Sequence, residues 1–268
     1  MGKRSVKKKT SKAIFVIIVL LLASVVFYCA MILINYYINY RKNENLNHSI
    51  AQNAKISRRI PDKTEHQEDE ISSELTDRLE SDLTFTIDFR AANQDYREIE
   101  AWLYCKDTPI DYPVVQTRDN ATYLERAIDG SYNLNGTLFI DYRNKSDFTD
   151  NNTIIYGHNM RSGSMFGTLP NYRYQDYYDD HPVMYLVTKK GEYAVALFAG
   201  VVVPEDAEIY SAETDDRELV ELVDTLRKES TFDADVTFKK GDRMVTLSTC
   251  SYEYDGARFI LLGKLIKL

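Results

Sequence analysis

Residues 13–34 form an apolar stretch without a single charge, and they limit the fold of this chain more than any other feature. They read AIFVIIVLLLASVVFYCAMILI. As a helix rising ~1.5 Å per residue, the stretch is about 33 Å long, enough to cross a hydrocarbon core of roughly 30 Å. Residues 1–12 hold six Lys or Arg and no acid, which by the positive-inside rule places the N-terminus in the cytoplasm. We therefore expect a single-pass protein of the cell membrane, with a cytoplasmic basic tail (1–12), a transmembrane signal anchor (13–34) and an extracellular remainder.

Three alternatives explain this stretch less well. A cleaved signal peptide has a shorter apolar core and a small-residue cleavage site, but no Ala-x-Ala follows here. A lipoprotein would use Cys29 as the lipidated residue, but bulky Phe27 and Tyr28 stand where small residues are expected. The core helix of a soluble protein rarely needs 22 consecutive uncharged residues.

The composition of the remainder indicates a folded, acidic domain. The chain has 268 residues, of which 44% are hydrophobic, so it can bury a core. Without the basic tail, 27 basic residues stand against 41 acidic ones, a net charge of −14, which argues against a nucleic-acid partner. Three cysteines are too few, and odd in number, for a disulfide scaffold.

Residues 35–81 are expected to form an extracellular stalk, because their first part is polar and shows no sustained apolar period. Residues 66–81 place Ile71, Leu75 and Leu79 at i, i+4 and i+8. This spacing fits a weak amphipathic helix packed on the domain, and fits a solvated end of the stalk equally well.

Residues 82–268 have the pattern of a mainly β domain with accessory helices. Short apolar or alternating runs recur between turn signals, and about eight of them suggest a closed or nearly closed barrel. The expected strands are 101–104, 110–115, 137–140, 153–156, 183–187, 193–203, 244–249 and 259–266. A Lys-Lys-Gly sequence at 189–191 is expected to form a hairpin turn.

Two helices are expected to interrupt these strands. Residues 214–228 carry leucine or valine at i, i+3, i+4 and i+7, with Thr214 as the cap and Asp215 and Asp216 at the positive end of the dipole. A shorter helix is expected over 120–126, capped by the preceding aspartate.

One of the four histidines is placed for chemistry. His48 and His66 lie in the polar stalk, and His181 lies in an Asp-Asp-His-Pro loop, where solvated or turn roles are expected. His158 instead follows the strand 153–156 through a glycine, a position from which a side chain faces a cleft.

One of the three cysteines is also placed for chemistry. Cys250 ends the run MVTLSTC, directly after the expected strand 244–249, whereas Cys29 lies in the anchor and Cys105 fits a small core residue. Arg258 opens the next strand, and two neighbouring strands would bring it beside Cys250. A cation favours a thiolate and can stabilise an oxyanion, while a histidine can act as general acid and base.

An ion pair of Arg258 with Glu253 or Asp255 explains the arginine's position equally well. Metal and cofactor sites are not expected, because the chain contains no HExxH, CxxC, Walker or GxGxxG motif.

These residues resemble the catalytic motifs of the sortase family. TLSTC at 246–250 with Arg258 in the following strand, and His158 in YGHNM upstream, form a combination far more specific than any one part. The resemblance spans roughly residues 83–268. The opening AWLYCKDTPIDYPVVQ followed by DNATYL, and the helix before the TLSTC strand, are similar to class B. No Asp-Pro-aromatic lid motif and no C-terminal apolar segment is seen, which counts against class C.

The resemblance implies an eight-stranded sortase barrel and a cysteine transpeptidase without a cofactor. Cys250 would cleave a C-terminal sorting signal of the Asn/Ser-Pro-x-Thr-x type after Thr, in a secreted protein. A thioacyl intermediate would then pass to the amine of a peptidoglycan precursor. His158 would act as acid and base, and Arg258 would hold the substrate or its oxyanion.

The resemblance also implies groove residues. Asn120 and Leu124 match an Asn-x-x-x-Leu pair that lines the class B groove, and Ser248 matches a groove serine. Tyr210, before the extra helix, fits a groove role or a packing role. Ser251 stands where some class B enzymes have glutamate.

Four alternatives stay open at this point. A pilin-type sortase would join protein subunits, a silent sortase-like surface protein would keep the fold without the activity, and a hydrolase would cleave the signal without transfer. A papain-like peptidase fits less well, because its cysteine usually precedes its histidine and opens a helix, whereas His158 precedes Cys250 here.

Overall fold

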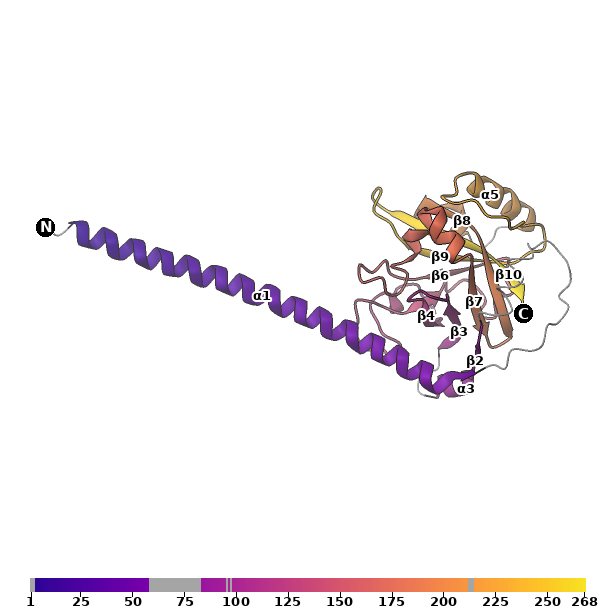
Figure 1. Ribbon diagram of the computed structural model, residues 1–268, viewed down its shortest axis with the longest axis horizontal. Helices are drawn as coiled ribbons and strands as arrows, with labels where there is room; N and C mark the ends of the chain where they lie inside the picture. Colours follow the sequence, from indigo (N-terminus) through magenta and orange to yellow (C-terminus); the bar gives the residue numbers. More distant parts are fainter. Residues whose placement is uncertain (1–2, 58–82, 95, 97, 212–214) are drawn as a thin grey trace. The chain divides into compact units, whose positions relative to one another are not determined.

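The chain forms two compact units, Met1–Glu44 and Asn45–Leu268. The computed structural model in Figure 1 describes residues 3–57, 83–94, 96, 98–211 and 215–268. The amphipathic pattern at 66–81 and the expected cap Thr214 therefore lie outside the described residues.

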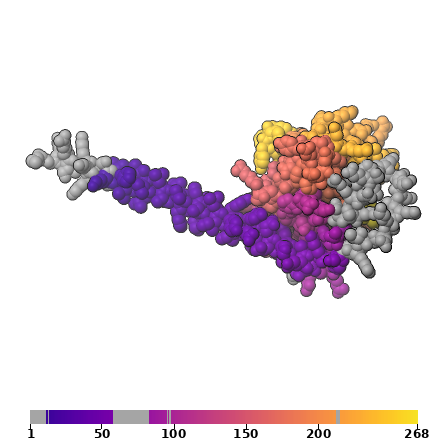
Figure 2. All heavy atoms as spheres, viewed as in Figure 1, coloured from indigo at the N-terminus to yellow at the C-terminus, as the bar shows by residue number. Residues whose placement is uncertain are grey.

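Helix α1 (Lys3–Ala54) contains the predicted anchor. Its large apolar side chains between residues 14 and 38 are exposed, and Figure 2 shows this part as a single rod of surface atoms. Among the described residues, it is the one helix long and apolar enough to cross a membrane.

The structure differs from the expected stalk over residues 45–57. The helix continues to Ala54, and β1 (Lys55–Ser57) then pairs antiparallel with β2 (Phe85–Ile87). Ile50 and Ala54 are buried in the same apolar cluster as Phe85. This segment therefore belongs to the folded unit, because its few apolar residues are covered by partners that lie far away in the sequence.

Eight strands close into a barrel, as the sequence predicts, in the order β10-β8-β7-β3-β4-β5-β6-β9. Their bounds are β3 (Ile99–Tyr104), β4 (Asp111–Val115), β5 (Leu138–Ile140), β6 (Asn152–Tyr156), β7 (Val183–Thr188), β8 (Gly191–Pro204), β9 (Met244–Cys250) and β10 (Ala257–Lys267). The predicted hairpin turn joins β7 to β8, where Thr188 pairs with Gly191. Gly191 has a φ of +149°, a conformation that favours glycine.

Residues of each strand alternate between two apolar clusters, which cover both faces of the sheet. Leu103, Leu247 and Leu261 belong to one cluster, and their neighbours Trp102 and Ile260 belong to the other. Helix α5 (Asp216–Lys228) lies against β8 and contributes Leu219, Val223 and Leu226 to the second cluster (Figure 1).

The helix caps differ in detail from the prediction. Helix α5 is capped by Asp215, whose carboxylate accepts from the backbone N–H groups of Arg217 and Glu218. The helix expected over 120–126 is a single 3-10 turn, η1 (Thr122–Leu124). It ends early because Arg126 forms a β-bridge with Tyr132 instead of continuing the helix.

The remaining short helices lie in the segments between strands. They are α3 (Phe89–Ala92), η2 (Leu169–Arg173), α4 (Gln175–Asp180) and η3 (Glu208–Tyr210).

Strand pairing brings the chemically interesting strand ends to one end of the barrel. β6 and β9 run parallel, with Tyr156 opposite Ser248, so the residues that follow both strands emerge together. β9 and β10 run antiparallel, with Cys250 opposite Arg258. Three strands, β6, β9 and β10, thus assemble the site, although β6 precedes β9 by almost one hundred residues.

Candidate active site

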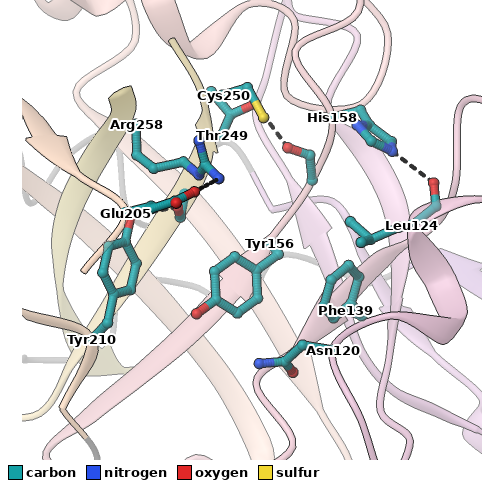
Figure 3. Close-up of a pocket in the computed structure, with 12 residues that line it drawn as sticks. Asn120, Leu124, Phe139, Tyr156, His158, Glu205, Tyr210, Thr249, Cys250 and Arg258 are labelled. Carbon is teal, nitrogen blue, oxygen red and sulfur yellow. Dashed lines mark hydrogen bonds and ion pairs between the residues drawn. The ribbon is translucent and has the colours of Figure 1, made fainter. Parts of the chain in front are cut away.

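A pocket of about 290 Å³ opens at this end of the barrel (Figure 3). Its lining residues are Asn120, Leu124, Phe139, Tyr156, Gly157, His158, Glu205, Tyr210, Ser248, Thr249, Cys250 and Arg258. All seven site residues expected from the sequence are among them. The structure therefore gathers in one cavity side chains that the sequence distributes over more than 130 positions.

Cys250 and Arg258 are held side by side by the β9–β10 ladder, in which they are direct register partners. The Nη2 atom of Arg258 donates to the carboxylate of Glu205 at 2.7 Å. The ion pair expected with Glu253 or Asp255 is not the one that forms: Arg258 pairs with Glu205, and Glu253 pairs with Arg173. Glu205 follows β8, whose last residue, Pro204, is the register partner of Ala257 in β10. No local sequence pattern predicts that pairing.

His158 is positioned by an extension of the parallel β6–β9 pairing. The backbone N–H of Gly157 donates to the carbonyl of Ser248 at 3.1 Å, and Asn159 Nδ2 donates to the carbonyl of Cys250 at 2.9 Å. A Cβ at Gly157 would lie 2.4 Å from Leu138 Cδ2, so glycine lets this strand end pack closely. In Figure 3, His158 and Arg258 lie on opposite sides of Cys250.

The imidazole of His158 has one nitrogen already engaged. Its Nε2 atom lies 2.6 Å from the carbonyl oxygen of Leu124. Because a carbonyl oxygen only accepts hydrogen bonds, Nε2 carries a hydrogen. Nδ1 is then the nitrogen of the neutral ring that can take up a proton.

The floor of the pocket is aromatic. Tyr156 stacks on Tyr210 with 6.2 Å between ring centroids, and its other neighbour, Phe139, lies 5.3 Å away. The hydroxyl of Tyr210 and the hydroxyl of Ser248 are 2.7 Å apart and buried. Burial raises the pKa of Tyr210 to about 12, although the bond to Ser248 and the positive charge of Arg258 act in the opposite direction. Tyr210 therefore stays a neutral hydrogen-bonding group at physiological pH.

Asn120 and Leu124 form another part of the lining. Asn120 Nδ2 donates to Asp141 at 3.0 Å, and its Oδ1 accepts from the backbone N–H of Tyr142 at 3.0 Å. Leu124 ends the turn η1 and is 41% exposed, which gives an apolar surface beside the polar amide.

Five pocket residues are not among the seven expected from the sequence: Phe139, Tyr156, Gly157, Glu205 and Thr249. Tyr156 could have been found, because it lies two residues before His158 and alternate residues of a strand face the same side. Phe139 and Glu205 carry no comparable signal, since their places depend on which strands become neighbours.

The other reactive side chains lie outside the pocket. Cys105 is buried, with its sulfur 3.8 Å from the hydroxyl of Tyr172. His181 Nδ1 lies 3.0 Å from the carbonyl oxygen of Tyr177. Within the described part of the chain, no three His, Cys, Asp or Glu residues gather as metal ligands would.

Comparisons with known proteins agree on one family. The family model described as Sortase domain matches residues 103–266. A relative named Sortase B from Listeria monocytogenes is 38% identical over 175 residues, which cover 63% of this chain and 70% of the relative. A second Sortase B, from Staphylococcus aureus, is 28% identical over 183 residues, covering 67% and 75%.

Solved structures agree as well. A crystal structure of sortase B from B. anthracis in complex with AAEK1 has a TM-score of 0.68 and 28% identity, and the match covers 87% of this chain and all of that one. A Staphylococcus aureus sortase B–substrate complex has a TM-score of 0.62 and 27% identity, covering 66% and 83%. This chain therefore belongs to class B of the sortase family, whose members are cysteine transpeptidases.

Proposed function

We propose that this transpeptidase is anchored in the cell membrane and cleaves a C-terminal sorting signal of the Asn/Ser-Pro-x-Thr-x type after the threonine. It then transfers the secreted protein to an amine of the cell wall through a thioacyl bond on Cys250. The observation that carries the proposal is the facing pair Cys250 and Arg258 on β9 and β10, in a pocket that also contains His158.

The proposed reaction has two steps. In the first, the thiolate of Cys250 forms a bond to the threonine carbonyl carbon, and the following C–N bond breaks. The leaving amine takes a proton from the imidazolium of His158. In the second, the incoming amine attacks the thioester carbon and gives its proton to His158, and the C–S bond breaks with its electron pair returning to Cys250.

Arg258 would stabilise the charge that develops on the carbonyl oxygen in both steps. A guanidinium cannot deprotonate in a protein and presents several N–H donors, which suits an oxyanion and excludes a role as base. The nitrogen of His158 that exchanges the proton would be Nδ1, because Nε2 is bonded to the Leu124 carbonyl.

The sorting signal would lie along Asn120, Leu124, Ser248 and Tyr210, which line the pocket. An amide and a hydroxyl can bond the extended backbone of a peptide, while Leu124 and the tyrosine rings offer apolar surface to its proline. The substrate complex of the Staphylococcus aureus relative supports a bound peptide as the ligand class.

The membrane would hold the N-terminal unit. Residues 13–34 are long enough to cross the bilayer, and the basic residues before them favour a cytoplasmic N-terminus. The unit Asn45–Leu268 would then lie outside the cell, where secreted proteins and peptidoglycan precursors are found.

Intact-protein mass spectrometry of the full chain in detergent micelles tests the proposal. Peptides of the Asn-Pro-x-Thr-x, Ser-Pro-x-Thr-x and Leu-Pro-x-Thr-x types are added separately. We expect a mass increase equal to the acyl fragment before the scissile bond, lost in Cys250→Ala and kept in Cys105→Ala. An added amine should then discharge the adduct into a product that contains it.

Two outcomes would contradict the proposal. A folded protein whose Cys250 is alkylated readily but forms no adduct with any peptide would not be an active transpeptidase for this signal class. Release of free acid alone, even at high amine concentration, would make the chain a hydrolase.

A further inference from the structure

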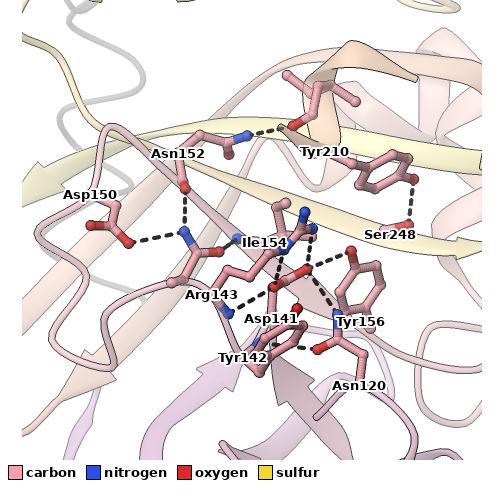
Figure 4. Close-up of polar contacts among 12 residues, drawn as sticks. Asn120, Asp141, Tyr142, Arg143, Asp150, Asn152, Ile154, Tyr156, Tyr210 and Ser248 are labelled. Carbon is pink, nitrogen blue, oxygen red and sulfur yellow. Dashed lines mark hydrogen bonds and ion pairs between the residues drawn. The ribbon is translucent and has the colours of Figure 1, made fainter. Parts of the chain in front are cut away.

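Asp141 is a buried carboxylate directly beneath the pocket. It follows β5 and is 1% exposed. Its side chain does not belong to the pocket lining, yet two of its hydrogen-bond donors, Asn120 and Tyr156, do (Figure 4). A carboxylate in this place cannot touch a substrate, but it can determine the orientation of the pocket side chains that it binds.

The two oxygens of Asp141 are used differently. Oδ2 accepts from Asn120 Nδ2 at 3.0 Å, from the Tyr156 hydroxyl at 3.0 Å and from Arg143 Nη2 at 2.7 Å. Oδ1 accepts from the backbone N–H of Arg143 at 3.0 Å and from its Nε at 2.9 Å. All five contacts need an acceptor. An ionised carboxylate accepts at both oxygens, whereas a protonated one would turn a hydroxyl hydrogen toward a donor.

The surroundings keep this carboxylate ionised. Burial raises the pKa of Asp141, but the hydrogen bonds from Arg143, Asn120 and Tyr156 outweigh it and leave the pKa below its ordinary value. Burial, followed by the negative charge of Asp141, raises the pKa of Tyr156, so its hydroxyl remains a donor.

This arrangement fixes the amide of Asn120. The carboxylate accepts only, so the NH₂ group must point toward Asp141, and the amide oxygen then meets the backbone N–H of Tyr142. One amide hydrogen and one lone pair remain for the pocket. The hydroxyl of Tyr156 is tied down in the same way, which holds its ring between Phe139 and Tyr210.

We propose that Asp141 is a positioning residue for the substrate groove, holding the Asn120 amide and the Tyr156 ring in the orientation that meets the backbone of the sorting signal. This inference rests on the proposed function. Asp141 acts on binding rather than on bond cleavage, because Cys250, Arg258 and His158 are held by the β9–β10 and β6–β9 pairings and by Leu124.

Asp141→Asn tests this in the full chain in detergent micelles, with a peptide that the wild type cleaves. The amide keeps the size of the carboxylate but places an NH₂ group against either Asn120 and Tyr156 or Arg143, all of which donate. We expect KM to rise about tenfold, because losing one hydrogen bond to a charged group changes a binding constant by about that factor. The value of kcat should stay within about twofold.

Asp150→Asn is the matched control. Asp150 lies in the same loop as Asp141, between β5 and β6. Its carboxylate stabilises this loop by accepting from the backbone N–H of Lys145 at 2.7 Å and from Asn144 Nδ2 at 3.0 Å. Neither donor lines the pocket. We expect an unchanged KM for this variant even if it lowers the melting temperature.

A double-mutant cycle separates positioning from general destabilisation. Asn120→Ala alone should raise KM. Asp141→Asn should raise KM less in that background than in the wild type, because only its effect through Tyr156 remains. Fully additive effects, or an equal KM for Asp141→Asn and wild type, would overturn the inference.

Two further measurements cover the remaining cases. If Asp141→Asn does not fold, Tyr156→Phe removes one of the Oδ2 donors and keeps the ring; an unchanged KM then counts against the inference.

NMR of the Asn120 side-chain amide, assigned by the loss of its signal in Asn120→Ala, does not require an active enzyme. Slow hydrogen exchange that becomes fast in Asp141→Asn supports the inference, and equally fast exchange in both overturns it. A wild type without turnover refutes the proposed function instead.

Discussion

Arg258 faces Cys250 across the antiparallel pair β9 and β10, although eight positions separate them along the chain. The guanidinium is thus delivered to the sulfur by backbone pairing rather than by a flexible loop. The Glu205 carboxylate, 2.7 Å from Arg258 Nη2, limits its freedom further.

Arg258→Ala should lower kcat/KM by roughly two to three orders of magnitude, the usual effect of removing an oxyanion donor. Arg258→Lys should recover little, because an ammonium lacks the planar set of donors. Peptide cleavage kinetics measure both. Arg126 is an exposed arginine outside the pocket, so Arg126→Ala should leave kcat/KM unchanged. Near-normal turnover in Arg258→Lys would mean that charge alone is enough.

Glu205→Gln should raise kcat/KM a few-fold at low ionic strength. In the proposed mechanism its carboxylate, 62% exposed, would compete with the developing oxyanion for Arg258, and an exposed ion pair adds only about 0–1 kcal/mol of stability. Glu208→Gln, another exposed carboxylate of this segment, is the control. A loss of activity as deep as that of Arg258→Ala would contradict this and show that turnover requires the ion pair between Glu205 and Arg258.

Ser248→Ala should reduce the free energy of unfolding by about 1–3 kcal/mol, because it leaves the buried hydroxyl of Tyr210 without its partner. Adding Tyr210→Phe should restore part of that loss, since both polar groups are then absent. Urea unfolding of the two single variants and the double variant measures the coupling. Additive losses would indicate that the two hydroxyls do not stabilise each other.

The stability contribution of Asp141 should disappear in acid. Its pKa is lower in the folded chain than its ordinary value of 3.8, so the unfolded chain binds more protons as pH falls. The contribution is therefore complete above about pH 4 and is lost as pH falls through the folded pKa. The difference in unfolding free energy between wild type and Asp141→Asn should shrink below pH 4. A difference that is constant from pH 7 to 2.5 would contradict this.

A chain starting at residue 82 should be less stable than one starting at residue 45, by about 3 kcal/mol or more. It loses the buried side chain of Ile50 and the β1–β2 ladder. It also loses Lys55, whose Nζ lies 2.5 Å from Asp111 and 4.1 Å from the centre of the Phe85 ring. Thermal unfolding compares the two chains, and equal melting temperatures would show that the segment is dispensable.

The long apolar helix, the eight barrel strands and the gathering of His158, Cys250 and Arg258 in one pocket could be predicted from the sequence. Each depends on a local pattern: a long uncharged run at 13–34, alternation or apolar runs between turn signals, or a motif such as TLSTC with Arg258 one strand later. Such patterns can be recognised without knowing which distant segments become neighbours, because each lies within one segment or two consecutive ones.

Partners that meet across the fold could not be predicted in this way. Glu205 reaches Arg258 from 53 positions away, and Asp141 receives Asn120 from 21 positions before it. The segment 45–57 looked like a stalk, because its own apolar residues are few and the strand that covers it lies beyond residue 82. Closure of the barrel determines which strand ends become neighbours, and burial then selects which polar side chains must pair. Neither is encoded in the local spacing of any one segment.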